Sequence, residues 1–132
     1  EREQVEMVSA MHPILSWESF DDPSVIKVIC NHANHALYFS RSPIPYVDRK
    51  RVETPPVNTL WGHIGVYGYK RSALMAYADS QVPQIETLES LEQLRAIHSG
   101  WKIKMIQWSK PLPGINTHSD LIAARKALKD GL

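Results

Sequence analysis

An arginine directly follows a run of strand-forming residues in the segment ALYFSRSPIP, residues 36–45. The guanidinium of Arg41 stays charged near neutral pH, and its planar fork can bind a carboxylate or a phosphate through two hydrogen bonds. Pro43 and Pro45 prevent the strand from continuing past this point. An anion site at the end of the strand is one interpretation. An ion pair or a solvent-exposed arginine is the alternative, and spacing by itself favours it.

A second set of candidate side chains lies in the segment LWGHIGVYGYK, residues 60–70. Alternation along a strand places four ring-bearing side chains on one face: Trp61, His63, Tyr67 and Tyr69. His63 on this face can donate a hydrogen bond to an anionic or hydroxyl-rich ligand. A histidine in a strand is more often a structural residue with internal partners, and both interpretations stay open.

Two carboxylates and an amide are spaced for one face of a predicted helix over residues 86–98, ETLESLEQLRAIH. Glu86, Glu89 and Gln93 fall within about 60° of each other at 100° per residue. The apolar stripe of this helix would be formed by three leucines: Leu88, Leu91 and Leu94. The polar face supplies the acceptors that the hydroxyls of a sugar need, but a solvated helix face would have the same composition.

Strands and helices predicted from the hydrophobic pattern must position these residues. Strands are expected over residues 5–14, 25–30, 36–40, 60–70 and 101–108, with the second and third forming a hairpin. Helices are expected over residues 71–80, 86–98 and 117–129. Residues 46–59 have charges and prolines without periodicity, which predicts a long loop with a functional or interface role. Strands interleaved with helices indicate the α/β class.

Length and composition restrict the possible functions. A chain of 132 residues with 43% hydrophobic content is expected to form a single domain. Its net charge of +1 gives no overall field that would favour binding to nucleic acid or to an anionic membrane. No window approaches the roughly 20 apolar residues of a membrane span. Cys30 is the only cysteine, which excludes an internal disulfide and fits a soluble protein of the reducing cytoplasm.

The chain contains no P-loop, dinucleotide-binding, zinc-protease or nucleophile-elbow motif. Five segments in order do resemble the C-terminal half of the 3-deoxy-manno-octulosonate (Kdo) cytidylyltransferases, the CMP-Kdo synthetases: SVIKVI, ALYFSRSPIP, HIGVYGY, LESLEQLR and GINTHSDL. The resemblance covers nearly all of residues 8–128. It implies the C-terminal portion of the three-layer α/β fold of nucleotide-diphospho-sugar transferases, with a mixed sheet and flanking helices.

The resemblance also implies an activity. CMP would be transferred from CTP to Kdo, giving CMP-Kdo and pyrophosphate for lipopolysaccharide biosynthesis, with magnesium as cofactor and a homodimer as the assembly. Arg41 would lie at the sugar and phosphate side of the cleft. The remaining substrate contacts implied by position are His63 and Tyr67 in the sugar pocket, and Glu86, Glu89 and Gln93 at the hydroxyls of Kdo. Residues 46–59 and Trp61 are candidate dimer contacts.

Two differences from the family pattern limit these expectations. The N-terminal half of the family, with its phosphate loop and cytosine pocket, has no counterpart in this chain, and the sequence starts with EREQVE, so we expect a fragment that is inactive by itself. The family usually has an aspartate magnesium ligand where this chain has Asn116, which would remove one negative charge from the site. A reaction on 8-amino-Kdo and a noncatalytic module for sugar binding or dimerisation remain as alternatives.

Overall fold

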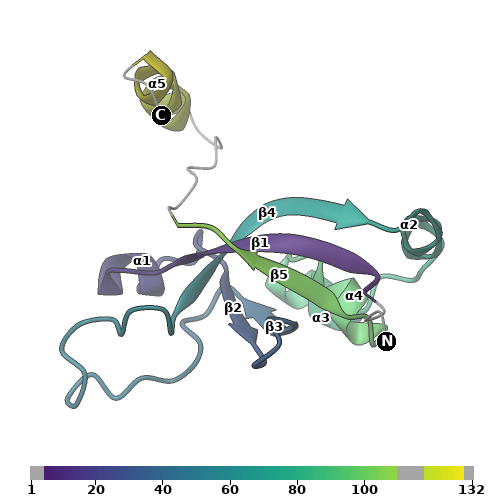
Figure 1. Ribbon diagram of the computed structural model, residues 1–132, viewed down its shortest axis with the longest axis horizontal. Helices are drawn as coiled ribbons and strands as arrows, with labels where there is room; N and C mark the ends of the chain where they lie inside the picture. The colour runs from purple at the N-terminus through teal and green to yellow at the C-terminus, as the bar shows by residue number, and fades with distance from the viewer. Residues whose placement is uncertain (1–4, 110–117, 130–132) are drawn as a thin grey trace.

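The sheet that carries the candidate residues has five strands in the order β3-β2-β4-β1-β5 in the computed structural model (Figure 1). The structure describes residues 5–109 and 118–129 of the chain. The strands are β1 (Met7–Pro13), β2 (Lys27–Cys30), β3 (Ala36–Ser40), β4 (Trp61–Tyr69) and β5 (Ile103–Gln107). β1 and β5 run parallel, whereas the other neighbouring strands are antiparallel. The expected mixed sheet of an α/β fold is therefore confirmed.

The predicted hairpin is confirmed as the antiparallel pair of β2 and β3. Asn34 has a φ of 56° in the connecting turn, a left-handed conformation that asparagine tolerates better than most residues. The side chain of Asn31 accepts hydrogen bonds from the backbone N–H groups of Ala33 and His35, both at 2.9 Å. This turn fixes the start of β3, and β3 then brings Arg41 to its far end.

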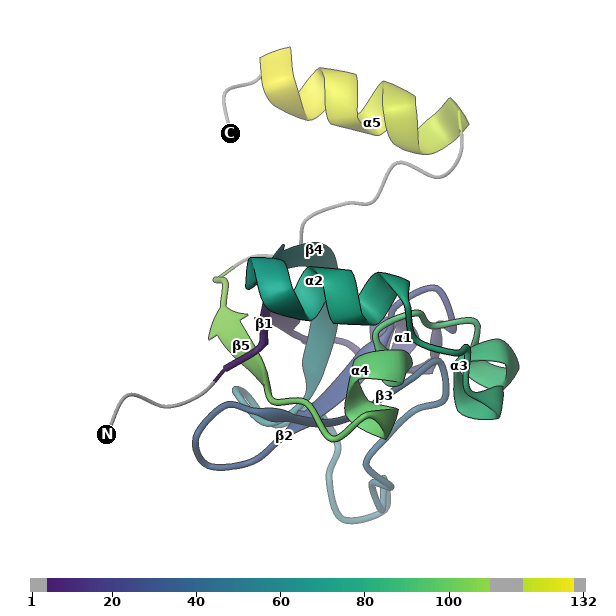
Figure 2. The ribbon, with the colours of Figure 1, turned by 90° about the vertical axis from the view of Figure 1, so that its right-hand side faces the viewer.

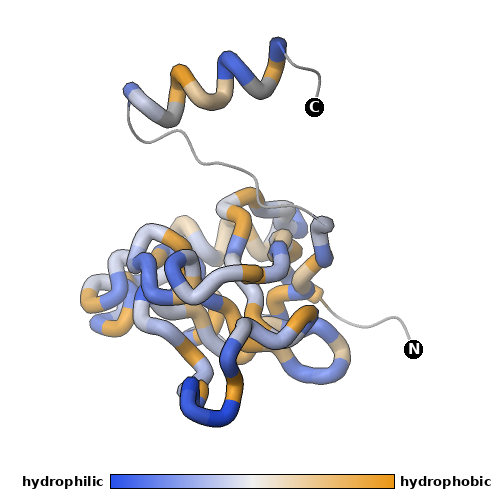
Figure 3. Tube along the Cα trace, turned by 90° about the vertical axis from the view of Figure 1, so that its left-hand side faces the viewer, coloured by the Kyte–Doolittle hydropathy of each residue, from blue (hydrophilic) through white to orange (hydrophobic). Residues whose placement is uncertain are grey.

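The helices of the described residues are α1 (Trp17–Asp21), α2 (Arg71–Ala78), α3 (Gln84–Glu89), α4 (Leu94–His98) and α5 (His118–Lys129). The segment from α3 to α4 packs on one face of the sheet, as Figures 1 and 2 show, and adds Leu91, Leu94 and Ala96 to the main hydrophobic core. α5 lies apart from the sheet, and Figure 3 shows hydrophobic and hydrophilic residues alternating along it. None of the described helices has the length and apolar character needed to cross a bilayer.

The single helix predicted over residues 86–98 is wrong, because the structure has two short helices there. Ser90 adopts a left-handed φ of 53° and ends α3. The break lets Leu91 and Leu94 enter the core, and burying a leucine stabilises the fold by about 1.5–3 kcal/mol. Leu88, which the continuous helix would place in the same apolar stripe, is 72% exposed. Tertiary burial therefore overrides the helical periodicity.

An irregularity in β4 preserves the predicted common face of its ring-bearing residues. The register with β1 shifts between Ser9, which pairs with Tyr67, and Ala10, which pairs with Ile64. β4 thus contains two extra residues at this point, and an even number leaves the alternation of side chains unchanged. The rings of His63 and Tyr67 remain neighbours, with centroids 5.5 Å apart.

The long loop of residues 46–59 contains no helix or strand, as expected. Its residues are held against α1. The indole N–H of Trp17 donates to the backbone carbonyl of Glu53 at 2.7 Å. Arg49 forms an ion pair with Asp21 and lies over the Trp17 ring, 4.6 Å from its centroid. Part of the loop is therefore packed on its own chain.

Cys30 is partly buried against the main hydrophobic core. Its sulfur is 3.7 Å from the sulfur of Met11, and burial raises the pKa of the thiol to about 11. A thiol with this pKa stays protonated near neutral pH, and a protonated thiol is a poor nucleophile. Cys30 is therefore a packing residue of the core and not a nucleophile.

Candidate functional site

Arg41 uses much of its hydrogen-bonding capacity on the backbone of its own chain. Its Nε donates to the carbonyl of Glu89 at 2.8 Å, and its two terminal nitrogens donate to the carbonyls of Pro23 at 3.1 Å and Ser90 at 3.2 Å. The carbonyls of Glu89 and Ser90 lie at the end of α3, where a helix lacks internal donors and favours a positive charge. Three of the five N–H groups of the guanidinium are therefore occupied, and the other two have no partner among the described residues.

Glu89 faces the end of β3 and is surrounded by donors. Its carboxylate accepts hydrogen bonds from the Ser40 hydroxyl at 2.6 Å, the Arg41 backbone N–H at 3.0 Å and the Tyr38 hydroxyl at 3.4 Å. Burial, followed by the nearby charge of Glu89, raises the pKa of Tyr38. Arg41 and Glu89 thus form one cluster that joins the end of β3 to α3.

Glu86 belongs to a different contact. Its carboxylate forms a two-bond ion pair with Arg95, with both N–O distances at 2.7 Å, and Arg95 lies over the Tyr77 ring at 4.6 Å. The predicted common face is wrong for Gln93, which lies beyond the end of α3, whereas Glu86 and Glu89 are three residues apart within α3. Glu86 ties α3 to α4 through Arg95, whereas the carboxylate of Glu89 binds donors at the end of β3.

His63 lies between the sheet and the α3–α4 segment. Its ring packs edge-on against Phe39, with centroids 4.9 Å apart, and its nitrogens contact the Ser9 hydroxyl at 2.8 Å and the Gln93 side-chain nitrogen at 3.4 Å. Burial, with a smaller contribution from His12, lowers the pKa of His63 to about 4, although the charge of Glu92 opposes the shift. His63 is therefore a neutral imidazole near pH 7.

Gln93 is the most deeply buried of the candidate polar residues, with 1% of its surface exposed. Its nitrogen contacts His63, but its Oε1 atom has no hydrogen-bond partner among the described residues. A buried acceptor without a donor costs about 1–3 kcal/mol. Among the candidate residues, this oxygen is the one atom that the described fold leaves both enclosed and unsatisfied.

Tyr67 and Glu92 complete this second cluster. The Tyr67 hydroxyl donates to Oε1 of Glu92 at 2.9 Å. Burial, together with the charge of Glu92, raises the pKa of Tyr67 well above its ordinary value, so its hydroxyl stays protonated. The Tyr77 hydroxyl donates to the backbone carbonyl of Glu92 at 2.9 Å. The cluster of His63, Tyr67, Glu92 and Gln93 is called the β4–α4 cluster below.

Sequence reasoning missed three polar residues at these contacts. Ser9 bonds His63, Glu92 bonds Tyr67, and Lys27 is fully buried with its ammonium donating to two backbone carbonyls near α1. Glu92 had a signal, because it precedes Gln93 in the LEQ segment. A serine or a lysine at alternate positions in a strand has no such signal, since the pattern does not show which of its faces is covered by polar groups.

The described residues offer no ready metal centre. Within residues 5–109 and 118–129, no group of three His, Cys, Asp or Glu side chains is arranged to hold a metal ion. Asn116, the expected magnesium ligand, lies outside the described residues.

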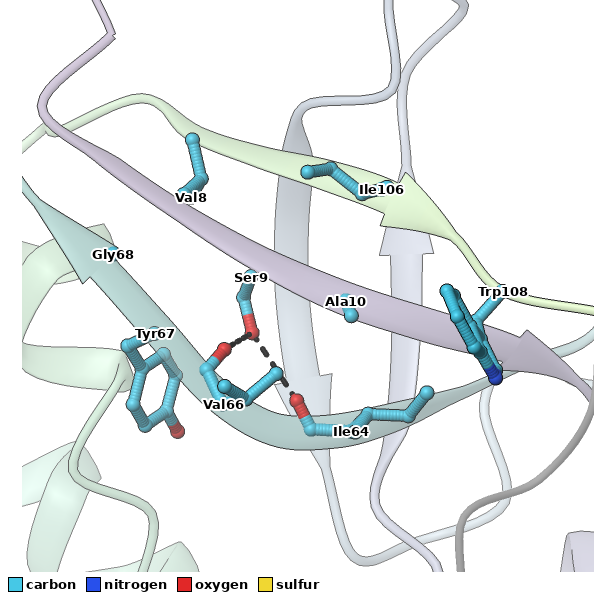
Figure 4. A pocket seen from close by; sticks show the side chains of 9 residues that line it. All are labelled: Val8, Ser9, Ala10, Ile64, Val66, Tyr67, Gly68, Ile106 and Trp108. Carbon is cyan, nitrogen blue, oxygen red and sulfur yellow. Dashed lines mark hydrogen bonds between the residues drawn. The ribbon is translucent and has the colours of Figure 1, made fainter. Parts of the chain in front are cut away.

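The sheet face opposite the α3–α4 segment is apolar. An open hollow of about 380 Å³ is lined almost entirely by apolar groups, among them Ile64, Val66, Ile106 and Trp108 (Figure 4). The last three side chains are more than half exposed. Of the predicted substrate residues, only Tyr67 borders this hollow. The predicted substrate residues other than Tyr67 therefore do not border the apolar hollow.

Comparison with known proteins identifies cytidylyltransferases among the relatives of this chain. A family model described as cytidylyltransferase matches residues 1–104. The chain is 39% identical to a 3-deoxy-manno-octulosonate cytidylyltransferase of Acaryochloris marina, across 100% of this chain and 52% of that protein. A protein of the same name from Legionella pneumophila is 40% identical across 89% of this chain and 46% of its own length.

A solved structure of CMP:2-keto-3-deoxy-manno-octonic acid synthetase complexed with CTP matches the fold with a TM-score of 0.85. It is 33% identical and covers 97% of this chain, which covers 51% of it. The chain thus spans about half the length of the relatives that it matches. The resemblance that the five sequence segments predicted is confirmed, and the chain belongs to the cytidylyltransferase family.

Proposed function

We propose that this chain is the sugar-binding half of a cytidylyltransferase that transfers CMP from CTP to Kdo and releases pyrophosphate. The observation that carries the proposal is the unsatisfied Oε1 of Gln93, enclosed beside the neutral His63. In this proposal the side chains that enclose this oxygen move apart on binding, and a sugar hydroxyl then supplies the donor that it lacks. The names of the relatives support the same substrate, and the whole reaction would yield CMP-Kdo for lipopolysaccharide biosynthesis.

Each residue of the β4–α4 cluster has a separate part in this proposal. Gln93 accepts a hydrogen bond from a hydroxyl of Kdo. Glu92 has one carboxylate oxygen engaged by Tyr67, and its second oxygen is available for another hydroxyl. His63 and Tyr67 form the aromatic wall against which the sugar ring packs. Because His63 is neutral, it adds no charge that would hold a carboxylate at this position.

Arg41 is the candidate for the anionic part of the substrate. Its two remaining N–H groups are available for the Kdo carboxylate or for a phosphate, while the other three hold the end of α3. Glu89 is engaged by donors of the chain, so in this proposal it orients Arg41 and Ser40. Glu86 supports the site through Arg95. Nucleotidyl transfer depends mainly on such positioning and charge stabilisation.

The proposal requires a second half of the protein, because the relatives are about twice as long. That half would provide the CTP site and cover the apolar sheet face around Val66, Ile106 and Trp108, which is too exposed for a finished core. Magnesium would belong to the assembled site, where it would neutralise phosphate charge, and Asn116 is its candidate ligand in this chain. The intact enzyme would act in the cytoplasm as a homodimer, with the loop of residues 46–59 as a candidate contact.

Replacing Gln93 tests this assignment in the intact protein. Gln93→Leu removes the buried acceptor at nearly the same volume, so the KM for Kdo should rise at least about 10-fold, as expected for one lost hydrogen bond to substrate. Pyrophosphate release from CTP at varied Kdo concentrations gives KM and kcat. Gln81→Leu, at an exposed loop position, is the matched control. An unchanged KM for Gln93→Leu would contradict the assignment of the sugar to this cluster.

A further inference from the structure

Ser9 lies at the irregularity of β4 and has more neighbouring acceptors than a hydroxyl can serve. Its oxygen is 2.8 Å from the carbonyl of Val66 and 3.3 Å from the carbonyl of Ile64 (Figure 4). It is also 2.8 Å from Nε2 of His63. The residue is 3% exposed, so water does not share these contacts freely. The direction of the single hydroxyl proton determines which of the neighbouring groups must donate a hydrogen bond and which must accept one.

Both carbonyl oxygens can only accept a hydrogen bond, so the proton of Ser9 must point toward them. The shorter contact assigns it to Val66. The hydroxyl oxygen then faces His63 with a lone pair, and the contact at 2.8 Å requires a proton on Nε2 of His63. The reverse arrangement would place two carbonyl oxygens against a lone pair in a buried position.

The proton on Nε2 has a consequence at the other nitrogen of the ring. Burial keeps His63 neutral, with a pKa of about 4, so its Nδ1 has no proton and accepts. The Gln93 side chain, 3.4 Å from Nδ1, must therefore present its NH₂ group to the ring. Its Oε1 is consequently turned away from His63, in agreement with the absence of a partner for this atom in the described part of the chain.

We propose that Ser9 is a positioning residue, which sets the tautomer of His63 and thereby directs the carboxamide oxygen of Gln93 toward the substrate. The relay runs from the Val66 carbonyl through Ser9 and His63 to Gln93, and each member fixes the orientation of the next. The two extra residues of β4 contribute to the relay, because they bring the carbonyls of Ile64 and Val66 close to the Ser9 hydroxyl. Only the final step, the substrate at Gln93, rests on the proposed function.

The tautomer can be measured directly. Long-range proton–nitrogen correlation NMR of ¹⁵N-labelled intact protein at pH 7 should show His63 with its proton on Nε2. Ser9→Thr keeps the hydroxyl, and Ser9→Val replaces it with a methyl group of the same shape. We expect the Nε2–H form in Ser9→Thr and a substantial population of the Nδ1–H form in Ser9→Val. A proton on Nδ1 in the unmodified protein, or identical tautomers in the Thr and Val variants, would overturn the relay.

Kinetics separate the relay from the proposed function. If Gln93 binds the sugar, Ser9→Val should raise the KM for Kdo about 10-fold with little change in kcat, and Ser9→Thr should restore it. A merely structural role would lower the melting temperature without this difference between the two variants. If the tautomer changes and the KM does not, the relay stands and the sugar site is wrong. If Ser9→Val does not fold, the spectrum of the unmodified protein and the smaller substitution Ser9→Ala decide the question.

Discussion

Removing the guanidinium of Arg41 should destabilise the fold, and the size of the loss follows from its three bonds to backbone carbonyls. The half-buried bond to the Glu89 carbonyl contributes about 1.5–3 kcal/mol, and the exposed bonds to Pro23 and Ser90 about 0.5 kcal/mol each. Arg41→Met, which keeps the length of the side chain, should therefore lower the free energy of unfolding by about 2.5–4 kcal/mol. This corresponds to about 10 °C in melting temperature.

Urea unfolding followed by tryptophan fluorescence measures this change. Arg51→Met is the matched control, because Arg51 is a loop arginine whose exposed side chain makes a 3.4 Å ion pair with Asp48. It should change the stability by less than about 0.5 kcal/mol. Arg41→Lys should recover part of the loss, since an ammonium cannot reach three separate carbonyls in one plane. A fully stable Arg41→Met protein would refute the structural role and leave ligand binding as the only function of this arginine.

Two further predictions concern the sheet. The pKa of His63 is about 4 in the folded state and ordinarily 6.5, so the unfolded chain binds more protons between these values and stability must fall as the pH drops from 6.5 toward 4. The free energy of unfolding, measured in urea at a series of pH values, should fall by about 3 kcal/mol over this range. His63→Gln should flatten this pH dependence, whereas the control His98→Gln, at an exposed position, should not. A Cβ atom on Gly68 would lie 2.8 Å from Cγ2 of Val8, whereas one on Gly65 would meet nothing within 4 Å. Gly68→Ala should therefore cost about 1–3 kcal/mol in thermal unfolding, and an equally small effect of Gly68→Ala and Gly65→Ala would contradict the packing of these strands.

Much of the sheet could be predicted because local signals and tertiary contacts agree. β3 begins and ends where the sequence predicts, since an asparagine-containing turn precedes it and prolines follow it. The common face of His63 and Tyr67 also follows from alternation, because the irregularity between them adds an even number of residues. The alternation of side chains predicted the strand faces correctly here because burial in the core favours the same faces.

The failure over residues 86–98 has the opposite cause. The helical pattern is locally convincing, but Ser90 leaves the helical conformation so that Leu91 can be buried and Arg41 can bind the carbonyls at the end of α3. No local signal marks this serine. The contacts of Ser9 were equally hidden, because they depend on carbonyl groups that a regular strand would not present to it.

The apolar face formed by Val66, Ile106 and Trp108 has a practical consequence for any study of this chain by itself. Two copies of the chain can cover each other there. A dimer of this origin would have the stoichiometry of the proposed homodimer but a different interface. If dimers of this chain disappear when Trp108 is replaced by Ser, the apolar face causes the dimerisation. The mass of the intact protein in solution then gives the stoichiometry of the biological assembly.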